Sequence, residues 1–84
     1  MRVELKLYAM LSDYLPVVAR QNNRLDLELD PGTTPAMLIE RFSLPLKLCH
    51  LVLINGAFVP PEARATRALV DGDVLAIWPP IAGG

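Results

Sequence analysis

Reactive side chains are scarce, since the 84 residues include one cysteine, Cys49, and one histidine, His50. A single cysteine excludes an internal disulfide framework, and this pair offers too few ligands for a zinc site. Because the two residues are adjacent, a strand would point their side chains to opposite faces, which does not suit a nucleophile and its base. We therefore expect Cys49 to be packed in the core rather than to act as a functional thiol.

An excess of one charge is also lacking. Eight basic and nine acidic residues give a formal net charge of −1, so there is no basic footprint for nucleic acid and no polybasic membrane patch. No apolar run approaches the length of a membrane span, and the first residues alternate charged with apolar side chains, unlike a signal peptide. We expect one small cytoplasmic domain with no nucleic-acid or membrane partner.

Glycine is sparse, with five residues in the chain. Three of them belong to the turn-forming pairs Pro31-Gly32, Asn55-Gly56 and Asp71-Gly72. They are too isolated for a phosphate-binding loop, and no serine stands in a Gly-x-Ser-x-Gly setting. The other two, Gly83-Gly84, close no turn. The sequence therefore contains no recognisable catalytic set, and its terminal Gly-Gly needs a separate explanation.

Hydrophobic periodicity predicts the strands. Residues 3–7 and 24–30 alternate apolar and charged side chains with a period of two, which is typical of half-buried strands. Asn55-Gly56 lies between two apolar runs and predicts a hairpin. Residues 74–78 form the last predicted strand, in which Trp78 shares the outward face with Val74 and Ala76. The first and last strands are far apart in sequence, and their pairing stays open at this point.

Two helices are predicted between these strands. A helical spacing of apolar residues begins at Met10 and is interrupted by Pro16, so a short helix should end near Leu15. Thr34-Pro35 has the hydroxyl N-cap and the N1 proline of a longer helix, which should end by Leu44. A broad apolar stripe of that helix is expected to pack on the sheet; its members are Met37, Leu38, Ile39 and Phe42.

The order of these elements indicates an α+β domain in which one main helix packs across a mixed sheet. The predicted core consists of the inward residues of the strands and helices. These are Val3, Leu5, Leu7, Leu11, Leu27, Leu38, Phe42, Leu75 and Ile77.

The last six residues are predicted to be a flexible tail, residues 79–84, that leaves a domain of residues 1–78. Pro79-Pro80 ends the last strand and stiffens the exit of the tail. The reactive group that the chain offers is then the α-carboxylate of Gly84, with Gly83 giving clearance in a narrow channel. A carboxylate needs activation before acyl transfer, and the chain has no nucleotide site, so a partner must supply the ATP site.

Leu69-x-Asp71-Gly72-Asp73 before the last strand, and Pro79-Pro80-Ile81-Ala82-Gly83-Gly84 after it, resemble the ubiquitin-like sulfur carriers. This family includes the small subunit of molybdopterin synthase (MoaD) and the thiamine-pathway carrier (ThiS). The resemblance extends to the strand at residues 3–7 and to Tyr8-Ala9. The two prolines are more similar to the molybdopterin type than to the thiamine type.

The resemblance implies a β-grasp (ubiquitin-like) fold and no bound cofactor. It also implies that a ubiquitin-activating-type enzyme adenylates Gly84 with ATP and that the product becomes a thiocarboxylate. The sulfur would pass to the large subunit of molybdopterin synthase, or to an equivalent acceptor, in molybdenum cofactor biosynthesis. The chain would then be a co-substrate rather than an enzyme.

Other readings remain open at the level of sequence. Carriers of this kind also serve thiamine thiazole, cysteine and tungsten-cofactor pathways, and a ubiquitin-like modifier would use the same activated glycine for an isopeptide bond. A plain binding module with an accidental tail is the third class. The terminal Gly-Gly does not separate the first two classes.

A partner surface is predicted from strand parity. Tyr8 and Trp78 both fall on outward faces, and they stand together on the helix-free side of the sheet if the first and last strands are neighbours. Phe58 is the third candidate member, and the alternative for each of the three aromatics is that it caps the edge of the core. With Pro80 and Ile81 of the tail, these residues form the predicted partner-binding surface.

Overall fold

The computed structural model describes residues 1–80, and residues 81–84 lie outside the described part. Its strands and α-helix are β1 (Arg2–Leu7), β2 (Arg24–Glu28), α1 (Pro35–Arg41), β3 (Leu51–Ile54), β4 (Ala57–Phe58) and β5 (Val74–Trp78). The connections contain the 3-10 helices η1 (Ala9–Tyr14), η2 (Val17–Ala19), η3 (Leu46–Leu48) and η4 (Pro61–Ala63). None of the helices within residues 1–80 is long and apolar enough to cross a membrane.

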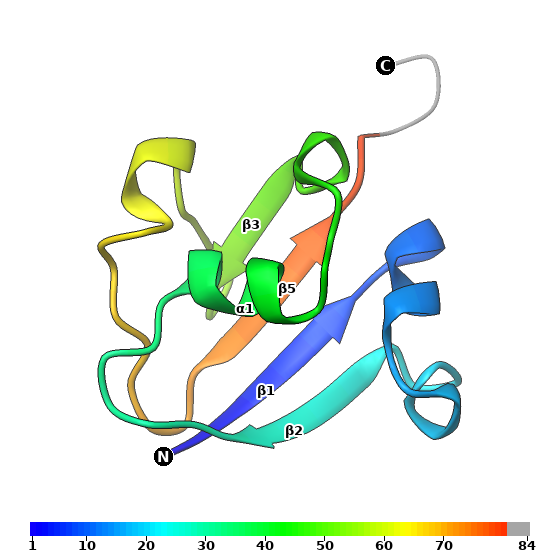
Figure 1. The fold of residues 1–84 in the computed structure, drawn as a ribbon, viewed down its shortest axis with the longest axis horizontal. Helices are drawn as coiled ribbons and strands as arrows, with labels where there is room; N and C mark the ends of the chain where they lie inside the picture. The colour runs from blue at the N-terminus through cyan, green and yellow to red at the C-terminus, as the bar shows by residue number, and fades with distance from the viewer. Residues whose placement is uncertain (81–84) are drawn as a thin grey trace.

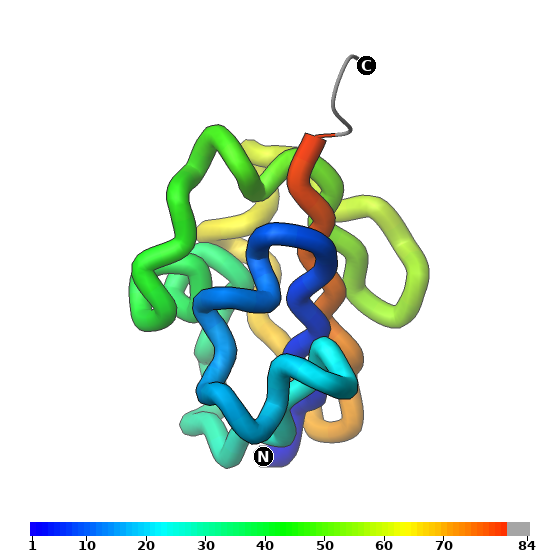
Figure 2. Tube along the Cα trace, turned by 90° about the vertical axis from the view of Figure 1, so that its right-hand side faces the viewer, coloured from blue at the N-terminus to red at the C-terminus, as the bar shows by residue number. Residues whose placement is uncertain are grey.

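The strands form one mixed sheet in the order β2-β1-β5-β3-β4 (Figure 1). β1 and β5 pair in parallel at its centre, with Leu5 opposite Leu75, and the other neighbouring strands are antiparallel. In both backbone views α1 lies across one face of this sheet (Figures 1 and 2). The arrangement is the expected β-grasp fold, and it answers the open question of whether the first and last strands are neighbours.

Helix α1 begins as the sequence predicts. The Thr34 side chain accepts a hydrogen bond from the Met37 backbone N–H at 3.3 Å, and Pro35 occupies the first turn, which together satisfy and pre-shape the helix start. The expected packing of Met37 on the sheet is wrong, because its side chain is 54% exposed. Phe42, predicted for the core, lies at the helix end and is only partly buried.

The other predicted core residues are buried, and the core is larger than predicted. It lies between α1 and the sheet and extends under the loops. The expected packing of Cys49 and Ile39 is confirmed, since both are buried. The buried apolar residues that the predicted core did not include are Leu15, Ala19, Leu29, Leu44, Val52, Ile54, Val59 and Leu69. Pro16 limits the first helical segment to the 3-10 helix η1, in which Leu11 alone is buried.

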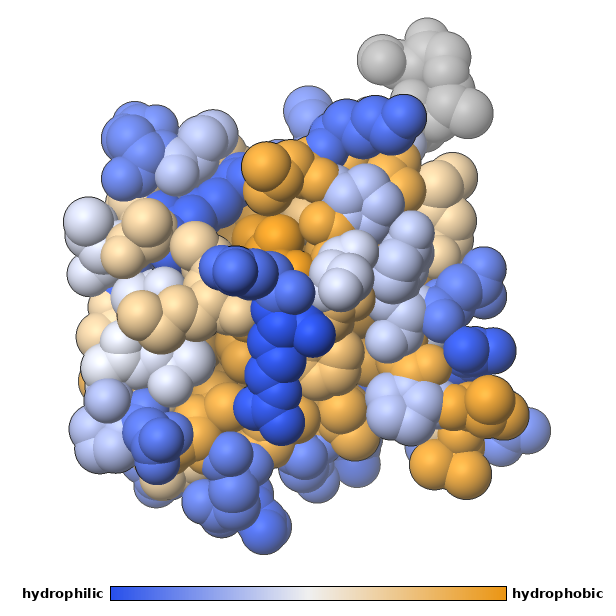
Figure 3. Space-filling model, viewed as in Figure 1, coloured by the Kyte–Doolittle hydropathy of each residue, from blue (hydrophilic) through white to orange (hydrophobic). Residues whose placement is uncertain are grey.

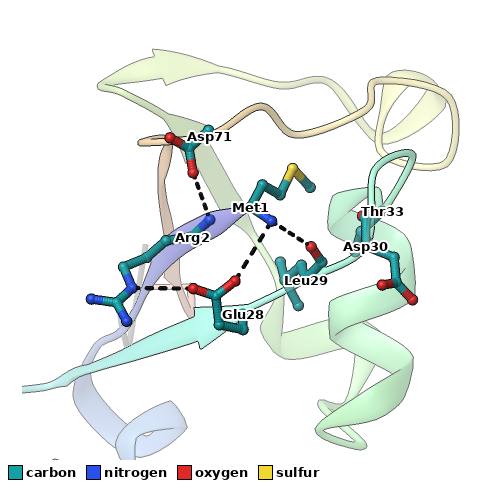
Figure 4. Close-up of polar contacts among 7 residues, drawn as sticks. All are labelled: Met1, Arg2, Glu28, Leu29, Asp30, Thr33 and Asp71. Atoms are coloured by element: carbon teal, nitrogen blue, oxygen red, sulfur yellow. Dashed lines mark hydrogen bonds and ion pairs between the residues drawn. The ribbon is translucent and has the colours of Figure 1, made fainter.

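Polar contacts tie the start of β1 to the turn at Asp71 and to the end of β2 (Figure 4). The backbone N–H of Arg2 donates to an Asp71 carboxylate oxygen at 2.7 Å, and the Arg2 guanidinium lies 3.6 Å from a Glu28 carboxylate oxygen. The Met1 amino group donates to the Leu29 carbonyl at 2.9 Å. Asp71 is thus a turn residue, as predicted, and its contact sets the register in which β5 enters beside β1.

A second polar link joins the β3–β4 turn to the start of β5. Asn55 and Gly56 both have positive φ, at 51° and 84°, as a two-residue hairpin turn requires. The carboxylate of Asp73 is buried and accepts hydrogen bonds from the Asn55 side-chain amide at 2.9 Å and from the Val70 N–H at 2.8 Å. Since its oxygens are satisfied, this buried carboxylate is structural.

Leu27 gives a direct test of the strand assignment. Replacing this buried residue of β2 with alanine should lower the free energy of unfolding by ~2–5 kcal/mol, through lost apolar burial and a residual cavity. The exposed Met37 is the matched control, and Met37→Ala should change stability by less than ~0.5 kcal/mol. Urea denaturation of both variants measures the difference, and equal midpoints would contradict the assignment of faces.

Candidate functional site

The parallel pairing of β1 and β5 brings Tyr8 and Trp78 into contact. Their rings stack with centroids 3.8 Å apart and planes inclined by 6°. The Tyr8 backbone N–H donates to the Ile77 carbonyl at 3.2 Å, which continues the ladder one residue beyond β1. Stacked aromatic pairs contribute ~0.5–1.5 kcal/mol beyond their buried area, so the pair is ordered although Trp78 is 40% exposed.

Cross-strand pairing extends this contact into an apolar surface on the side of the sheet opposite α1. Leu51 lies opposite Trp78, and Leu53 lies opposite both Ala76 and Phe58. Directly opposed residues share a face, and Phe58 is 53% exposed rather than folded over the core. We call the set the outer apolar surface; its members are Tyr8, Leu51, Leu53, Phe58, Ala76 and Trp78.

The other half of the same face is charged. Glu4 projects from β1 and lies 3.4 Å from the Arg24 guanidinium and 3.7 Å from the Lys6 ammonium. Solvent-exposed ion pairs of this kind contribute little to stability. They do mark the edge of the outer apolar surface, which is therefore confined to β5, β3, β4 and the end of β1.

The exit of the chain is held from both sides. The Trp78 carbonyl accepts a hydrogen bond from the His50 N–H at 3.1 Å, and the Ile77 carbonyl accepts the one from Tyr8. Pro79 is buried and Pro80 is exposed. The backbone is thus fixed through Trp78, beside the outer apolar surface. The predicted site residues Ile81, Gly83 and Gly84 lie outside the described residues.

Cys49 and His50 form no catalytic pair. The Cys49 side chain is 3% exposed and its thiol donates to the Pro45 carbonyl at 3.4 Å. Burial raises the pKa of the Cys49 thiol, and the nearby Arg64 charge opposes this to a smaller degree, so the thiol is protonated at neutral pH and is a poor nucleophile. No group of three or more potential metal ligands occurs within residues 1–80.

Two features of the site were not predicted from the sequence. Leu51 and Leu53 belong to an unbroken apolar run, and without alternation their outward direction leaves no periodic signal. The Arg64 guanidinium donates to the carbonyls of Val59, Cys49 and His50 at 3.1, 2.9 and 3.3 Å. No sequence signal indicates such a backbone clamp, since its acceptors are carbonyl groups that every residue carries.

Comparisons with solved structures find the same fold. The Haloferax volcanii HVO 2177 protein is 26% identical, with a TM-score of 0.75 over all of this chain and 87% of that one. SAMP1 from Haloferax volcanii is 22% identical with a TM-score of 0.69, and both chains are covered completely. A chain in the complex of subunits 1 and 2 of Molybdopterin-converting factor from Helicobacter pylori 26695 is 18% identical with a TM-score of 0.62, again over both full lengths.

Comparison with curated proteins gives no match. The ThiS family model matches residues 16–84, which covers α1, the sheet strands from β2 onward and the terminal Gly-Gly. The match spans well over half of the chain and includes the segment on which the resemblance was based. The chain belongs to the ThiS family and is a ubiquitin-like sulfur carrier of the ThiS/MoaD type.

Proposed function

We propose that this protein carries sulfur as a thiocarboxylate on the α-carboxyl group of Gly84, for molybdenum cofactor (molybdopterin) biosynthesis. It acts as a co-substrate, as the resemblance to the sulfur carriers implies, and it needs two partners. The first is a ubiquitin-activating-type enzyme that adenylates the tail. The second is a large subunit of the molybdopterin synthase kind, which accepts the sulfur.

The chemistry proceeds in two steps on the tail. A carboxylate oxygen of Gly84 attacks the α-phosphorus of ATP, which forms an acyl-adenylate and releases pyrophosphate. A sulfur nucleophile, supplied as sulfide or as a persulfide, then attacks the acyl carbon and displaces AMP. With sulfide the product is the thiocarboxylate directly, whereas a persulfide adduct needs a further thiol to cleave its S–S bond.

The observation that carries this proposal is the family match through the terminal glycines, residues 16–84. The geometry around the tail supports it. The backbone hydrogen bonds at Ile77 and Trp78 fix where the chain leaves the sheet, so a partner docked beside that point lies within reach of the tail. The outer apolar surface lies at this place.

The choice of the molybdenum pathway rests on two further points. Pro79-Pro80 precedes the tail, as in the molybdopterin-type carriers that the sequence resembles. The fold also matches a chain of the Helicobacter Molybdopterin-converting factor, which was solved as a complex of two subunits. A partner subunit that accepts sulfur is therefore expected for this chain as well.

A ubiquitin-like protein modifier is the second candidate, and the fold similarity to SAMP1 fits it. The two functions diverge after activation, because a modifier passes its acyl group to a lysine amine. Incubation with the activating enzyme, ATP, a sulfur source and cell extract separates them by intact mass. A carrier gains the mass difference between sulfur and oxygen, whereas a modifier appears in larger conjugates.

The tail glycine provides the first functional prediction. Deleting Gly84, or replacing it with alanine, should greatly reduce adenylation and thiocarboxylation, because a Cβ or a missing residue displaces the reacting carboxyl from attack geometry. Intact mass after reaction with the activating enzyme measures the loss. Circular dichroism and urea denaturation should stay unchanged. Normal thiocarboxylation of the deletion variant would show that the proposed function is wrong.

The outer apolar surface provides the second functional prediction. We expect both partners to dock there in turn, since exposed aromatic side chains dominate binding interfaces. Trp78→Ala should weaken association with each partner by more than ~1 kcal/mol. Val18→Ala is the control, because Val18 is exposed but lies on η2 outside this surface, and it should leave both affinities unchanged.

Competition tests whether the surface is shared. One partner is titrated into a preformed complex of this protein with the other partner. If the surface is shared, the added partner should displace the first one instead of joining the complex. A ternary complex that contains a single carrier chain would rule out the shared surface. Folding of Trp78→Ala is checked by denaturation, since loss of the Tyr8 stack costs ~0.5–1.5 kcal/mol on its own.

A further inference from the structure

A groove lies on the helix side of the molecule, on the face opposite the outer apolar surface. Two adjoining hollows of about 460 and 440 Å³ share Ala36, Ile39 and Leu46 as lining residues. α1 forms one wall, and η3 and the loop after β4 form the others. Figure 3 shows apolar surface gathered in this region with hydrophilic residues around it. We call this feature the helix-side groove.

Most of the side chains that line the helix-side groove are apolar, and within residues 1–80 no element covers it. Leu46 is 79% exposed on η3, while the side chains of Ala36, Ile39, Cys49 and Pro61 line the larger hollow. An exposed leucine beside an open apolar hollow is unfavourable in water unless a second molecule covers both. A binding function explains their juxtaposition.

Charge identifies what would bind. Three basic residues, Lys47, His50 and Arg64, line the larger hollow, and no acidic residue does. Within residues 1–80, neither Lys47 nor Arg64 forms an ion pair with a carboxylate. The smaller hollow contains Glu40 instead. A ligand would therefore place its negative charge at the end near Lys47 and its apolar part toward Ile39.

Arg64 is pre-organised for this role. Its three hydrogen bonds to the carbonyls of Val59, Cys49 and His50 hold the guanidinium plane in place. These bonds leave further N–H donors of the guanidinium unused. A fixed arginine loses little conformational entropy when it binds a carboxylate, so the clamp serves both the fold and the groove.

We propose that the helix-side groove binds a short segment of a partner protein in which an apolar side chain neighbours an acidic one. The apolar side chain packs against Leu46 and Ile39, and the carboxylate lies between Lys47 and Arg64. Two adjoining open hollows give room for more than one side chain, which suits a peptide segment. This surface is separate from the outer apolar surface, so both can be occupied together. The inference does not depend on the proposed sulfur chemistry.

The test uses the isolated full-length protein and a blocked peptide, acetyl-Leu-Asp-Leu-Asp-Leu-amide, with the corresponding Leu-Lys peptide as its charge-reversed control. Titration followed by ¹⁵N–¹H NMR should shift the amide signals of Ala36, Lys47, His50 and Arg64. The Trp78 indole signal should stay in place. Affinity should fall as sodium chloride is raised, because salt screens the charged part of the contact.

Two variants locate the site. Leu46→Asp should weaken binding of the Leu-Asp peptide about tenfold, through lost apolar contact and added negative charge. Val18→Asp introduces the same charge at a residue that is 87% exposed elsewhere, and it should change binding less than about twofold. Lys47→Glu should weaken binding about fivefold.

Several outcomes would overturn the proposal. They are equal binding of the Leu-Lys peptide, unchanged affinity of Leu46→Asp, shifts that map to the outer apolar surface, and no shifts up to a peptide concentration of about 1 mM. Sulfur transfer is not measured in this experiment. A negative result in the peptide titration therefore does not affect the proposed sulfur-carrier function. Likewise, normal thiocarboxylation of the Gly84 variants would not affect the proposal for the helix-side groove.

Discussion

The parallel pairing of β1 with β5 is the constraint on which the rest of the structure depends. It joins the two ends of the chain at the centre of the sheet and buries Leu5 and Leu75 side by side. Side chains alternate along a strand, so a slip of one residue would turn Tyr8 inward and Leu7 outward. The Asp71 contact with the start of β1 opposes such a slip. The aromatic stack and the position of the chain exit both follow from this register.

The two faces of the sheet have different surroundings because the domain is small. One face is covered by α1, and the other is open to solvent. Within residues 1–80 of this 84-residue chain, one short α-helix is present, and it covers one face of the mixed sheet (Figure 2). The outward residues of β3, β4 and β5 are then left to water. On β1 and β2 charged side chains occupy the outward positions, whereas β3 and β5 retain leucine, alanine and tryptophan there. Exposed apolar surface is thus confined to one half of this face, which supports the docking role proposed for it.

Local patterns in the sequence predicted most of the strands and helices. Contacts between segments that are distant in the sequence were harder to predict. The strand predicted from the alternation around Leu27 and the helix start predicted from Thr34-Pro35 are both confirmed. Each of these elements depends on residues that are neighbours in the sequence. Met37 was misplaced because α1 buries Pro35, Leu38 and Ile39, which have the i, i+3, i+4 spacing of one helix face, and Met37 lies beside that face. The outward direction of Leu53 depends on pairing with β5, which no local pattern encodes. The predicted roles of Gly83 and Gly84 remain predictions.

In the proposed function, the folded domain binds the partner and the tail carries the reacting group, and this separation has a physical basis. The chain is held by backbone hydrogen bonds up to Trp78, and Pro79 is buried, so recognition by a partner can use preformed surface and costs little ordering entropy. The carboxyl group of Gly84 lies a few residues beyond, at most ~20 Å from Pro79 in an extended chain. A short tail beside a rigid docking surface would keep the carboxyl group of Gly84 close to the active site of a docked partner. Under the proposed function, stability and chemistry reside in different residues, and changes in the core should affect sulfur transfer only through loss of the folded state.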